Sequence, residues 1–531
     1  MSLRRHLSVC ACLVAQLAAG CFNPTGTGGD STGGSTAAPT TDSTGATTTP
    51  DPGTTTTGTT ALPDSTTSTD TTAPVTTAPD ECPAECPPEA PYCDGGTCVG
   101  CKDFEDLSCA ALFPDQPNCD ADSGVCVACL ADIQCAGGLV CHQQLSQCVE
   151  CEESADCGDP AAPVCDQATH TCRACEAHAE CGERACERET GKCFPESALA
   201  TAVRYAEPGA GGCDAHDCLT PDTPCCSVAQ ALIKLQQSNE LTHVVVHLAG
   251  TDNAPVNVTG AVLAGRAVAL RGTDGAALTA KTNGGSPTVW LNNGAAGRLY
   301  LADVDVFDAN GAAAVACTTG DLLWVDDARI SNAQNVNIGN PAPGLYGENC
   351  DLHADRTVIV GNQIGVRITG DRKATLRNTI VAGSTNELRS EIEVDNGARL
   401  ELVYATVGDT NNKIGSLLAA TSALNVTIRN SALVAGPNDT LVITAPLDNL
   451  TIDYSAVPSE DLLGRGSGNV YVADPVAEID FKSWPNDLRL DAPGLLANVA
   501  RWQPGDPRTD LEGAPRPARP DTPDVAGADL P

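Results

Sequence analysis

A pattern of apolar and small residues recurs seven times between Leu299 and Val457. Each copy has an apolar residue, two variable positions, a small residue, another variable position and an aliphatic or β-branched residue. The last positions of successive copies lie 24, 29, 22, 26, 26 and 24 residues apart. Short apolar runs at this spacing, separated by Gly, Asn and Asp, are typical of solenoids whose units stack to bury their faces. The copies occupy residues 301–306, 325–330, 354–359, 376–381, 402–407, 428–433 and 452–457.

The repeat predicts an all-β region in which each copy is one turn of a parallel β-helix. Two earlier runs, Val268–Leu270 and Val289–Leu291, fit the pattern as further turns. About ten turns would extend over roughly 48 Å, because stacked strands lie about 4.8 Å apart. Such a fold does not by itself specify a function.

The third position of the motif has two interpretations. Asn and Asp tolerate the left-handed backbone that a sharp turn between strands requires, so the column is interpreted first as a ladder of turn residues. In the alternative, Asp303 and Asp327 form a pair of carboxylates that binds Ca²⁺ or shares acid and base roles in sugar cleavage. Arg356, on the next turn, favours simple charge neutralisation instead. The column consists of Asp303, Asp327, Arg356, Asn378, Tyr404, Asn430 and Tyr454.

The N-terminus has the pattern of an export signal followed by a stalk. In residues 1–20, Arg4 and Arg5 precede an apolar run that is too short to span a membrane and ends in small residues. Residues 21–81 are rich in Thr, Gly, Ser and Pro, which predicts disorder. The segment Ala18–Cys21 resembles the lipobox of bacterial lipoproteins, which implies cleavage before Cys21 and attachment of lipid to it.

Residues 82–194 contain five groups of four cysteines, and each group follows its predecessor after a two-residue gap. In four groups the last two cysteines enclose six residues, many of them turn formers, which predicts small hairpins. Junctions such as Cys126-x-x-Cys129 also match zinc-ligand spacing. Disulfides are favoured because export is expected, and because removing Cys10, Cys12 and Cys21 from the 29 cysteines leaves an even 26.

This cysteine block resembles the repeats of exported lipoproteins from myxobacteria and related bacteria. Those proteins combine a lipobox, a Thr/Gly/Ser stalk and groups of the form Cys-Asp-x-x-Thr-x-x-Cys, which Cys165–Cys172 matches. The resemblance covers roughly the first 195 residues. It implies a lipid-anchored protein displayed at the bacterial outer membrane or cell surface. It does not imply any chemical reaction.

Residues 195–500 are predicted to form the β-helix, with a helix that covers its first turn. Ser227 and Gln230 form a candidate capping box, and the next apolar residues fall on one helical face. A solenoid needs such a cap because an open end exposes its core and strand edges. The opening, with the Gly-rich segment Pro208–Cys213 and then Cys225-Cys-Ser227 before the helix, resembles the start of right-handed parallel β-helix proteins of the pectin-lyase-like class. In the tail, residues 501–531, the segments Asp510–Pro517 and Asp524–Ala528 resemble the closing segment of that class.

Cys317 and Cys350 lie in consecutive predicted turns. Adjacent turns bring their backbones to a separation that a disulfide can bridge. We therefore predict a disulfide between these two cysteines.

The overall charge narrows the classes of partner. With 68 acidic and 30 basic residues, the formal charge of −38 repels nucleic acid and other polyanions. The sequence contains no phosphate-binding loop, dinucleotide fingerprint, nucleophile elbow or zinc-protease motif. We predict no cofactor, except that the carboxylate pair leaves Ca²⁺ open.

Together these features predict a non-catalytic, lipid-anchored surface protein that displays its β-helix for adhesion or glycan binding. The expected partners are a membrane, through the lipid, and a polysaccharide or cell-surface ligand. The alternative is a carbohydrate-active enzyme, a polysaccharide lyase or glycoside hydrolase, on the same β-helix. Asp303 and Asp327 are then its candidate catalytic residues.

Overall fold

The computed structural model divides into two units, Met1–Thr77 and Ala78–Pro531, and every residue described below lies in the second. The predicted signal peptide, the lipidated Cys21 and the stalk lie outside the described residues. Among the residues that the structure describes, no helix is long and apolar enough to cross a membrane. The described residues are 86–87, 90–94, 96–103, 108–196, 201–236, 243–259, 266–273, 275–279, 285–292, 297–310, 312–335, 341–386, 388–408, 416–436, 443–444, 447–484 and 486–531.

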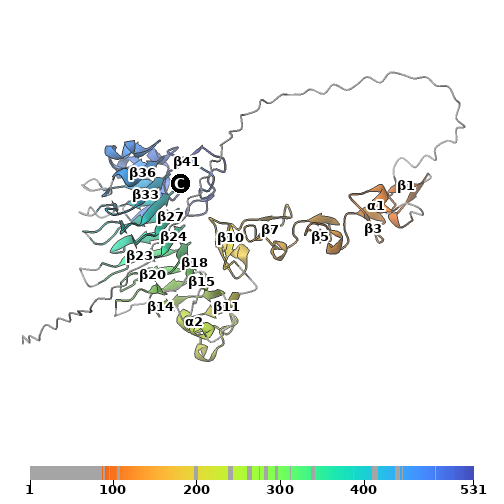
Figure 1. The fold of residues 1–531 in the computed structure, drawn as a ribbon, viewed down its shortest axis with the longest axis horizontal. Coiled ribbons are helices and arrows are strands. Elements are labelled where there is room, and N and C mark those ends of the chain that lie inside the picture. Colours follow the sequence, from red (N-terminus) through yellow and green to blue (C-terminus); the bar gives the residue numbers. More distant parts are fainter. Residues whose placement is uncertain are drawn as a thin grey trace, which may run out of the picture. The chain divides into compact units, whose positions relative to one another are not determined.

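The repeat region is a parallel β-helix, as the sequence pattern predicts (Figure 1). Successive segments of each turn enter three different sheets, and each strand pairs in parallel with its counterpart one turn on. The first sheet contains β11 (Thr201–Ala206), β12 (His243–Leu248), β15 (Ala267–Gly272), β18 (Arg298–Ala302), β21 (Leu322–Asp326), β24 (Asp351–Asp355), β27 (Lys373–Arg377), β30 (Arg399–Val403), β33 (Asn425–Arg429) and β36 (Leu450–Asp453).

The other two sheets complete each turn. The second sheet contains β13 (Thr251–Asp252), β16 (Ala277–Leu278), β19 (Asp305–Phe307), β22 (Arg329–Ser331), β25 (Val358–Val360), β28 (Ile380–Ala382), β31 (Thr406–Gly408), β34 (Ala432–Val434), β37 (Ala456–Val457) and β38 (Val470–Tyr471). The third sheet contains β14 (Val256–Thr259), β17 (Val289–Asn292), β20 (Val315–Thr319), β23 (Pro343–Glu348), β26 (Ile364–Thr369), β29 (Ile392–Asp395), β32 (Leu418–Ala419) and β35 (Ile443–Thr444).

The core of the β-helix is one continuous cluster of aliphatic side chains. On each strand alternate residues point inward, so that β21 contributes Leu323 and Val325 to the core while Trp324 points outward. The next strand of the same turn, β22, contributes Ile330. Each turn alone would expose these side chains, so burial requires the stack.

The corner between the first and second sheets uses left-handed backbone in every repeat. All seven residues of the motif's third position have positive φ, between 44° and 57°. The interpretation of this column as a ladder of turn residues is therefore confirmed. The corner that follows the second-sheet strands also uses left-handed backbone, at Asp308, Asn332, Gly361 and Gly383.

The two ends of the β-helix are covered. Helix α2 (Val228–Gln236) buries Val228, Ala231, Leu232 and Leu235 against the first turns. Its start has the predicted capping residues: Ser227 Oγ accepts from the Gln230 amide, and Gln230 Oε1 accepts from the Cys226 amide. At the other end, η7 (Glu460–Arg465) places Leu462 in the core cluster. The chain after β38 continues as α4 (Pro475–Glu478), β39 (Asp480–Ser483), β40 (Asp487–Ala492), β41 (Ala500–Trp502) and β42 (Thr522–Asp524).

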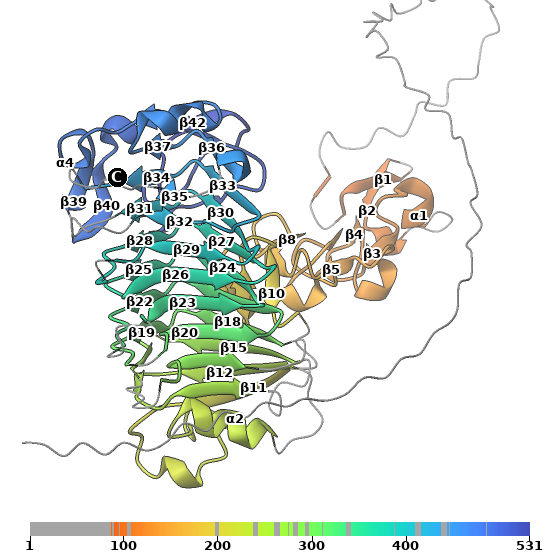
Figure 2. The same ribbon diagram turned by 60° about the vertical axis from the view of Figure 1, so that its left-hand side comes forward.

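This C-terminal segment covers part of the second sheet. Phe481, Leu488 and Trp502 share a hydrophobic cluster with outward side chains of the second sheet from β28 to β37. Figure 2 shows the hairpin of β39 and β40 beside that end of the sheet.

The cysteine groups form five small modules, each with an antiparallel hairpin that places its last two cysteines opposite each other. In the four modules whose bridges are fully described, the first cysteine pairs with the third and the second with the fourth. The prediction of disulfides is confirmed, and the Cys-x-x-Cys junctions join neighbouring modules without pairing. The hairpins are β1 (Tyr92–Asp94) with β2 (Thr97–Val99), β3 (Asn118–Asp120) with β4 (Val125–Val127), β5 (Val140–His142) with β6 (Gln147–Val149), β7 (Val164–Asp166) with β8 (Thr171–Arg173), and β9 (Ala185–Glu187) with β10 (Lys192–Phe194).

Short helices complete the modules and loops. They are α1 (Cys109–Leu112), η1 (Cys101–Asp103), η2 (Asp132–Gln134), η3 (Ser154–Asp156), η4 (His178–Cys181), η5 (Cys213–Ala215), η6 (Leu447–Asn449), η7 (Glu460–Arg465) and η8 (Gly494–Leu496).

The fifth module, residues 175–194, packs on the outer face of the first sheet (Figures 1 and 2). Phe194 stacks on Tyr300 with a centroid separation of 5.1 Å, and Ala185 joins the same cluster. Tyr300, Trp324 and His353, on successive strands, form a continuous stack of rings beneath the module. The module and the β-helix therefore share a hydrophobic cluster.

Candidate functional site

The carboxylates suggested by the sequence, Asp303 and Asp327, lie at the left-handed corner beside the fifth module. Asp327 is ion-paired on both sides, with Arg188 Nη2 at 2.5 Å and with Arg356 Nε at 2.6 Å. Asp303 reaches solvent, but the surrounding protein and the nearby Asp327 charge raise its pKa to about 6. These two residues are neighbours, yet Asp327 is engaged in a contact between parts of the chain.

We call this contact the joint; it consists of His178 and Arg188 from the fifth module with Tyr300, Asp326 and Asp327 from the β-helix. Arg188 Nη1 lies 2.9 Å from Asp326 Oδ1, and the Asp326 side chain is fully buried. The Tyr300 hydroxyl lies 2.7 Å from the Cys186 carbonyl and 2.9 Å from Asp326 Oδ2. The hydroxyl therefore shares its one proton between these two acceptors. Burial raises the pKa of Asp326, and the Arg188 charge opposes the shift.

The joint does not have the chemistry of a metal site, although His178, Asp326 and Asp327 bring three ligand atoms together. His178 Nδ1 accepts a hydrogen bond from the Cys186 amide at 3.0 Å, so the neutral ring carries its proton on Nε2. A histidine ligand instead uses one ring nitrogen for the metal and donates from the other. Burial and Arg188 lower the pKa of His178 to about 3. Arg188 and Arg356 also supply the positive charge that a calcium ion would bring.

Cys317, in β20, and Cys350, just before β24, form a disulfide with a Cα separation of 6.0 Å. Both cysteines are fully buried. The bridge joins neighbouring turns inside the core, so its role is structural.

The third sheet differs from the other two because no hydrophobic cluster of described residues includes its outward side chains from β17 to β29. Pairing between neighbouring strands aligns Trp290, Ala316, Tyr346, Arg367 and Glu393 in one outward column. We call it the third-sheet column. It brings two half-buried aromatic rings and a half-buried arginine into line with a buried carboxylate.

The two aromatic rings of the column are half-buried and held in place. Trp290 Nε1 donates to Thr318 Oγ1 at 2.9 Å, and the Tyr346 hydroxyl donates to Glu348 Oε2 at 3.1 Å. Burial and the Glu348 charge raise the pKa of Tyr346 to about 12, so it remains protonated. The rings lie two turns apart, or about 10 Å. The intervening Ala316 is fully buried.

The charged end of the column has unsatisfied hydrogen-bonding groups. Arg367 Nε lies 3.6 Å from Glu393 Oε2 and its Nη2 lies 3.8 Å from Asp395 Oδ2, which are ion pairs but not hydrogen bonds. Accordingly Arg367 Nε and Glu393 Oε2 are buried without a hydrogen-bond partner among the described residues. Buried polar atoms are normally paired, so these two atoms mark a place for a polar ligand or ordered water.

Glu393 is the titratable group of most interest in the column. It is 5% exposed, and burial raises the pKa of its carboxyl, while Arg389 and Arg367 oppose the shift. Arg389 Nη1 contacts its other oxygen at 3.3 Å. Asp395, two residues along β29, faces the same side, and Arg367 bridges both carboxylates.

Sequence reasoning missed the third-sheet column because the repeating motif covers only the first two sheets. The third-sheet strands vary in spacing and carry no fixed residue. The signal that was present is the alternation in Val289-Trp-Leu291 and Val366-Arg-Ile368, where one polar or aromatic residue separates two inward aliphatic ones.

Comparisons with known proteins add little to the site. Residues 64–162 match the model of a family of unknown function (DUF8331). No curated protein sequence matches the chain. Among solved structures, the chain is similar to the crystal structure of pectate lyase Pel9A, with 9% identity and a TM-score of 0.36 over 62% of this chain and 96% of that chain. A TM-score this low does not establish a fold. The assignment of a β-helix therefore depends on the parallel pairing of this chain's own strands.

Proposed function

We propose that this is a non-catalytic, lipid-anchored surface protein whose third-sheet column binds a glycan chain. The observation that carries the proposal is the column itself, with two fixed aromatic rings and a pair of unsatisfied polar atoms on a sheet whose outward side chains join no hydrophobic cluster of described residues. Aromatic faces pack against the apolar faces of sugar rings, and arginine and carboxylate groups bind their hydroxyls. Stacked strands repeat at about 4.8 Å, a spacing comparable with the length of a sugar unit in an extended chain.

The charges of the column favour binding over cleavage. Hydrolysis by two carboxylates needs one as an acid and the other as a base or nucleophile, separated by the scissile bond. Here Arg367 lies against both Glu393 and Asp395. In the other carboxylate pair, Asp327 is already ion-paired with both Arg188 and Arg356, which leaves Asp303 without a second available carboxylate.

A carbohydrate-active enzyme is the second candidate, and one observation favours it. The buried Glu393 carboxyl has a raised pKa, and a general acid must hold its proton near neutral pH. In that case Glu393 would be the acid, and activity would depend on it rather than on Asp303 or Asp327.

Binding is tested with the full chain and a panel of neutral and acidic polysaccharides, by affinity electrophoresis. Trp290→Ala and Tyr346→Ala should each weaken binding at least about tenfold, since each removes one of two stacking rings. Tyr471→Ala is the matched control, because Tyr471 is an exposed aromatic on β38 of the second sheet. If the full panel fails to bind, or if Tyr471→Ala weakens binding as much, the proposal is wrong.

Catalysis is tested on the same panel by the release of reducing or unsaturated sugar. Our proposal expects no release. Release that Glu393→Gln abolishes, and that Asp303→Asn leaves intact, would establish the enzyme instead.

Anchoring is proposed from Cys21, the stalk and the cysteine-rich modules, which together would hold the β-helix away from a bacterial outer membrane. Labelled palmitate should be incorporated into the expressed chain and lost in Cys21→Ser. Incorporation into Cys21→Ser at the level of the parent would contradict the proposal.

A further inference from the structure

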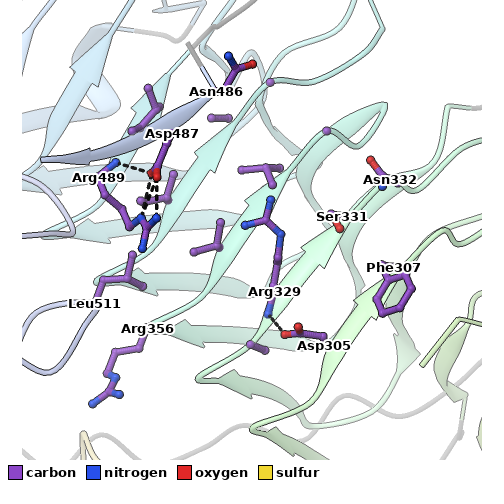
Figure 3. Close-up of a pocket in the computed structure, with 18 of the residues that line it drawn as sticks. Asp305, Phe307, Arg329, Ser331, Asn332, Arg356, Asn486, Asp487, Arg489 and Leu511 are labelled. Atoms are coloured by element: carbon purple, nitrogen blue, oxygen red, sulfur yellow. Dashed lines mark hydrogen bonds and ion pairs between the residues drawn. The ribbon is translucent and has the colours of Figure 1, made fainter. Parts of the chain in front are cut away.

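A groove of about 980 Å³ crosses the outer face of the second sheet beside the C-terminal segment (Figure 3). Its floor consists of outward side chains of β19, β22, β25 and β28, and one wall consists of residues 486–489 with Leu511 and Glu512. The groove is separate from the third-sheet column. The hydrophobic cluster of the C-terminal segment reaches β25, where Val358 and Val360 pack against it only in part, and it includes no side chain of β19 or β22.

Arg329 stands in the groove with its guanidinium group unpaired. In Figure 3 its side chain lies between the Asp487–Arg489 pair on one side and Ser331, Asn332 and Phe307 on the other. Only its backbone amide is bonded, donating to Asp305 Oδ1 at 2.8 Å. The guanidinium makes no hydrogen bond or ion pair with any residue that the structure describes.

The other two arginines of the groove are already neutralised. Arg489 contacts Asp487 and Glu512, each at 2.6 Å, and Arg356 contacts Asp327 at 2.6 Å. Arg329 is therefore the one cation in the described lining that remains available for a ligand. The described lining also contains five carboxylates, those of Asp305, Asp308, Asp327, Asp487 and Glu512, so the unpaired guanidinium of Arg329 is the one point of the groove that favours a carboxylate of a ligand.

The floor beside Arg329 is aliphatic. Val358 and Val360 are half-buried, and Ile380 and Ala382 extend the same apolar strip under the wall. Phe307 is the one aromatic side chain among the described residues that line the groove. The aliphatic strip can pack against aliphatic side chains of a ligand, whereas sugar rings are usually recognised by aromatic faces. The strip therefore favours a peptide over a glycan.

We propose that this groove binds an extended peptide segment of a partner protein, with one acidic residue on Arg329 and aliphatic residues over Val358 and Val360. The groove lies on strands locked into the β-helix, so it is preformed and binding requires little ordering of the receptor. A single carboxylate suits it better than an acidic run, because the overall negative charge repels polyanions. The proposal does not depend on glycan binding by the third sheet.

The test uses the full chain and fluorescein-labelled nine-residue peptides of alternating Val and Thr with a central Asp, Asn or Lys, in fluorescence anisotropy. The Asp peptide should bind, the Lys peptide should not, and added salt should weaken the complex. Arg329→Ala should weaken binding of the Asp peptide at least about tenfold. Val360→Thr, which keeps the shape but adds a hydroxyl to the floor, should weaken it severalfold.

Arg519→Ala is the matched control, because Arg519 is exposed in the loop before β42 and lies outside the groove. It should leave the affinity unchanged, and near-ultraviolet circular dichroism should show that every variant is folded. The proposal fails if no peptide binds at millimolar concentration, or if Arg329→Ala binds as the parent does. It also fails if an acidic oligosaccharide binds through Arg329 and displaces the peptide.

Discussion

At the scale of residues, the left-handed corner is occupied by side chains of very different chemistry. Asn378 and Asn430 suit this backbone, but Tyr404 and Tyr454 adopt it at a cost that packing must offset. Tyr404 is fully buried, with the Arg516 guanidinium 3.9 Å from its ring centre. The sequence identified these corner positions because spacing alone locates them. It did not show which corners also bind a second part of the chain.

Asn430 illustrates this double role and provides the first prediction. Its Nδ2 donates to the Arg501 carbonyl and Asp506, and its Oδ1 accepts from the Arg501 amide, which ties the C-terminal segment to the β-helix. Asn430→Ala should lower the free energy of unfolding by roughly 2–4 kcal/mol, because buried polar groups lose their partners. Asn396→Ala, at an exposed left-handed corner with one side-chain bond, should cost about 1 kcal/mol. Urea unfolding checks both, and equal losses would contradict the prediction.

Asp529 provides a pH-dependent prediction. It is 1% exposed, and burial raises the pKa of its carboxyl from 3.8 to about 6. Since the folded-state pKa is the higher one, protonation stabilises the fold below about pH 4, and this stability is lost as pH rises through 6. Asp529→Asn should therefore raise the free energy of unfolding at pH 7.5 by roughly 1–3 kcal/mol and change it little at pH 4. Asp480→Asn, on exposed β39, controls for the loss of one carboxylate. A gain that is the same at both pH values would refute the assignment.

At the scale of elements, the sequence predicted the strands of the first two sheets and the cap helix, because burial imposes alternation on strands and a 3.6-residue period on a helix. Val228, Ala231, Leu232 and Leu235 are buried on α2 for this reason. The third-sheet strands were harder to predict, because loops of variable length precede them. The C-terminal hairpin of β39 and β40 also lacks the repeat, since it packs on the outside of the second sheet.

The bridge between Cys317 and Cys350 gives a prediction at this scale. Replacing both cysteines by alanine should lower the free energy of unfolding by about 3–4 kcal/mol, as expected for opening a loop of this length, with a sequence separation of 33 residues. Denaturant unfolding measures the loss. In the single variant Cys317→Ser, alkylation under non-reducing conditions should add one label, on Cys350. If the parent protein takes up label at both positions, the bridge does not form in solution.

At the scale of the whole molecule, the five cysteine groups look equivalent in sequence, yet the fifth module packs on the β-helix through its own residues. Arg188 meets Asp326 and Asp327 across more than 130 positions of sequence. No local pattern encodes a contact between elements so far apart. The sequence feature that could have indicated this contact is the content of the fifth group, which contains His178, Arg188 and, next to its last cysteine, Phe194. Of the two carboxylates that the sequence suggested as a site, Asp327 belongs to this joint, and Asp303 lies exposed beside it.

The joint yields the last prediction. Arg188→Met keeps the length of the side chain but leaves the buried Asp326 and the partly buried Asp327 short of one positive charge. Breaking such a pair should cost roughly 3–5 kcal/mol of docking free energy. Hydrogen exchange should then accelerate in β18, β21 and β24 under the module, and protease should cut faster between residues 194 and 201. Adding Asp326→Asn to Arg188→Met should restore much of the protection, because the buried charge that lost its partner is removed, while Asp327 keeps its ion pair with Arg356. Arg508→Met is the control, since its ion pair with Glu176 is largely exposed. If the double variant is less protected than Arg188→Met, charge compensation does not hold the module in place, and the stacked rings of Phe194, Tyr300 and Trp324 must supply the docking energy.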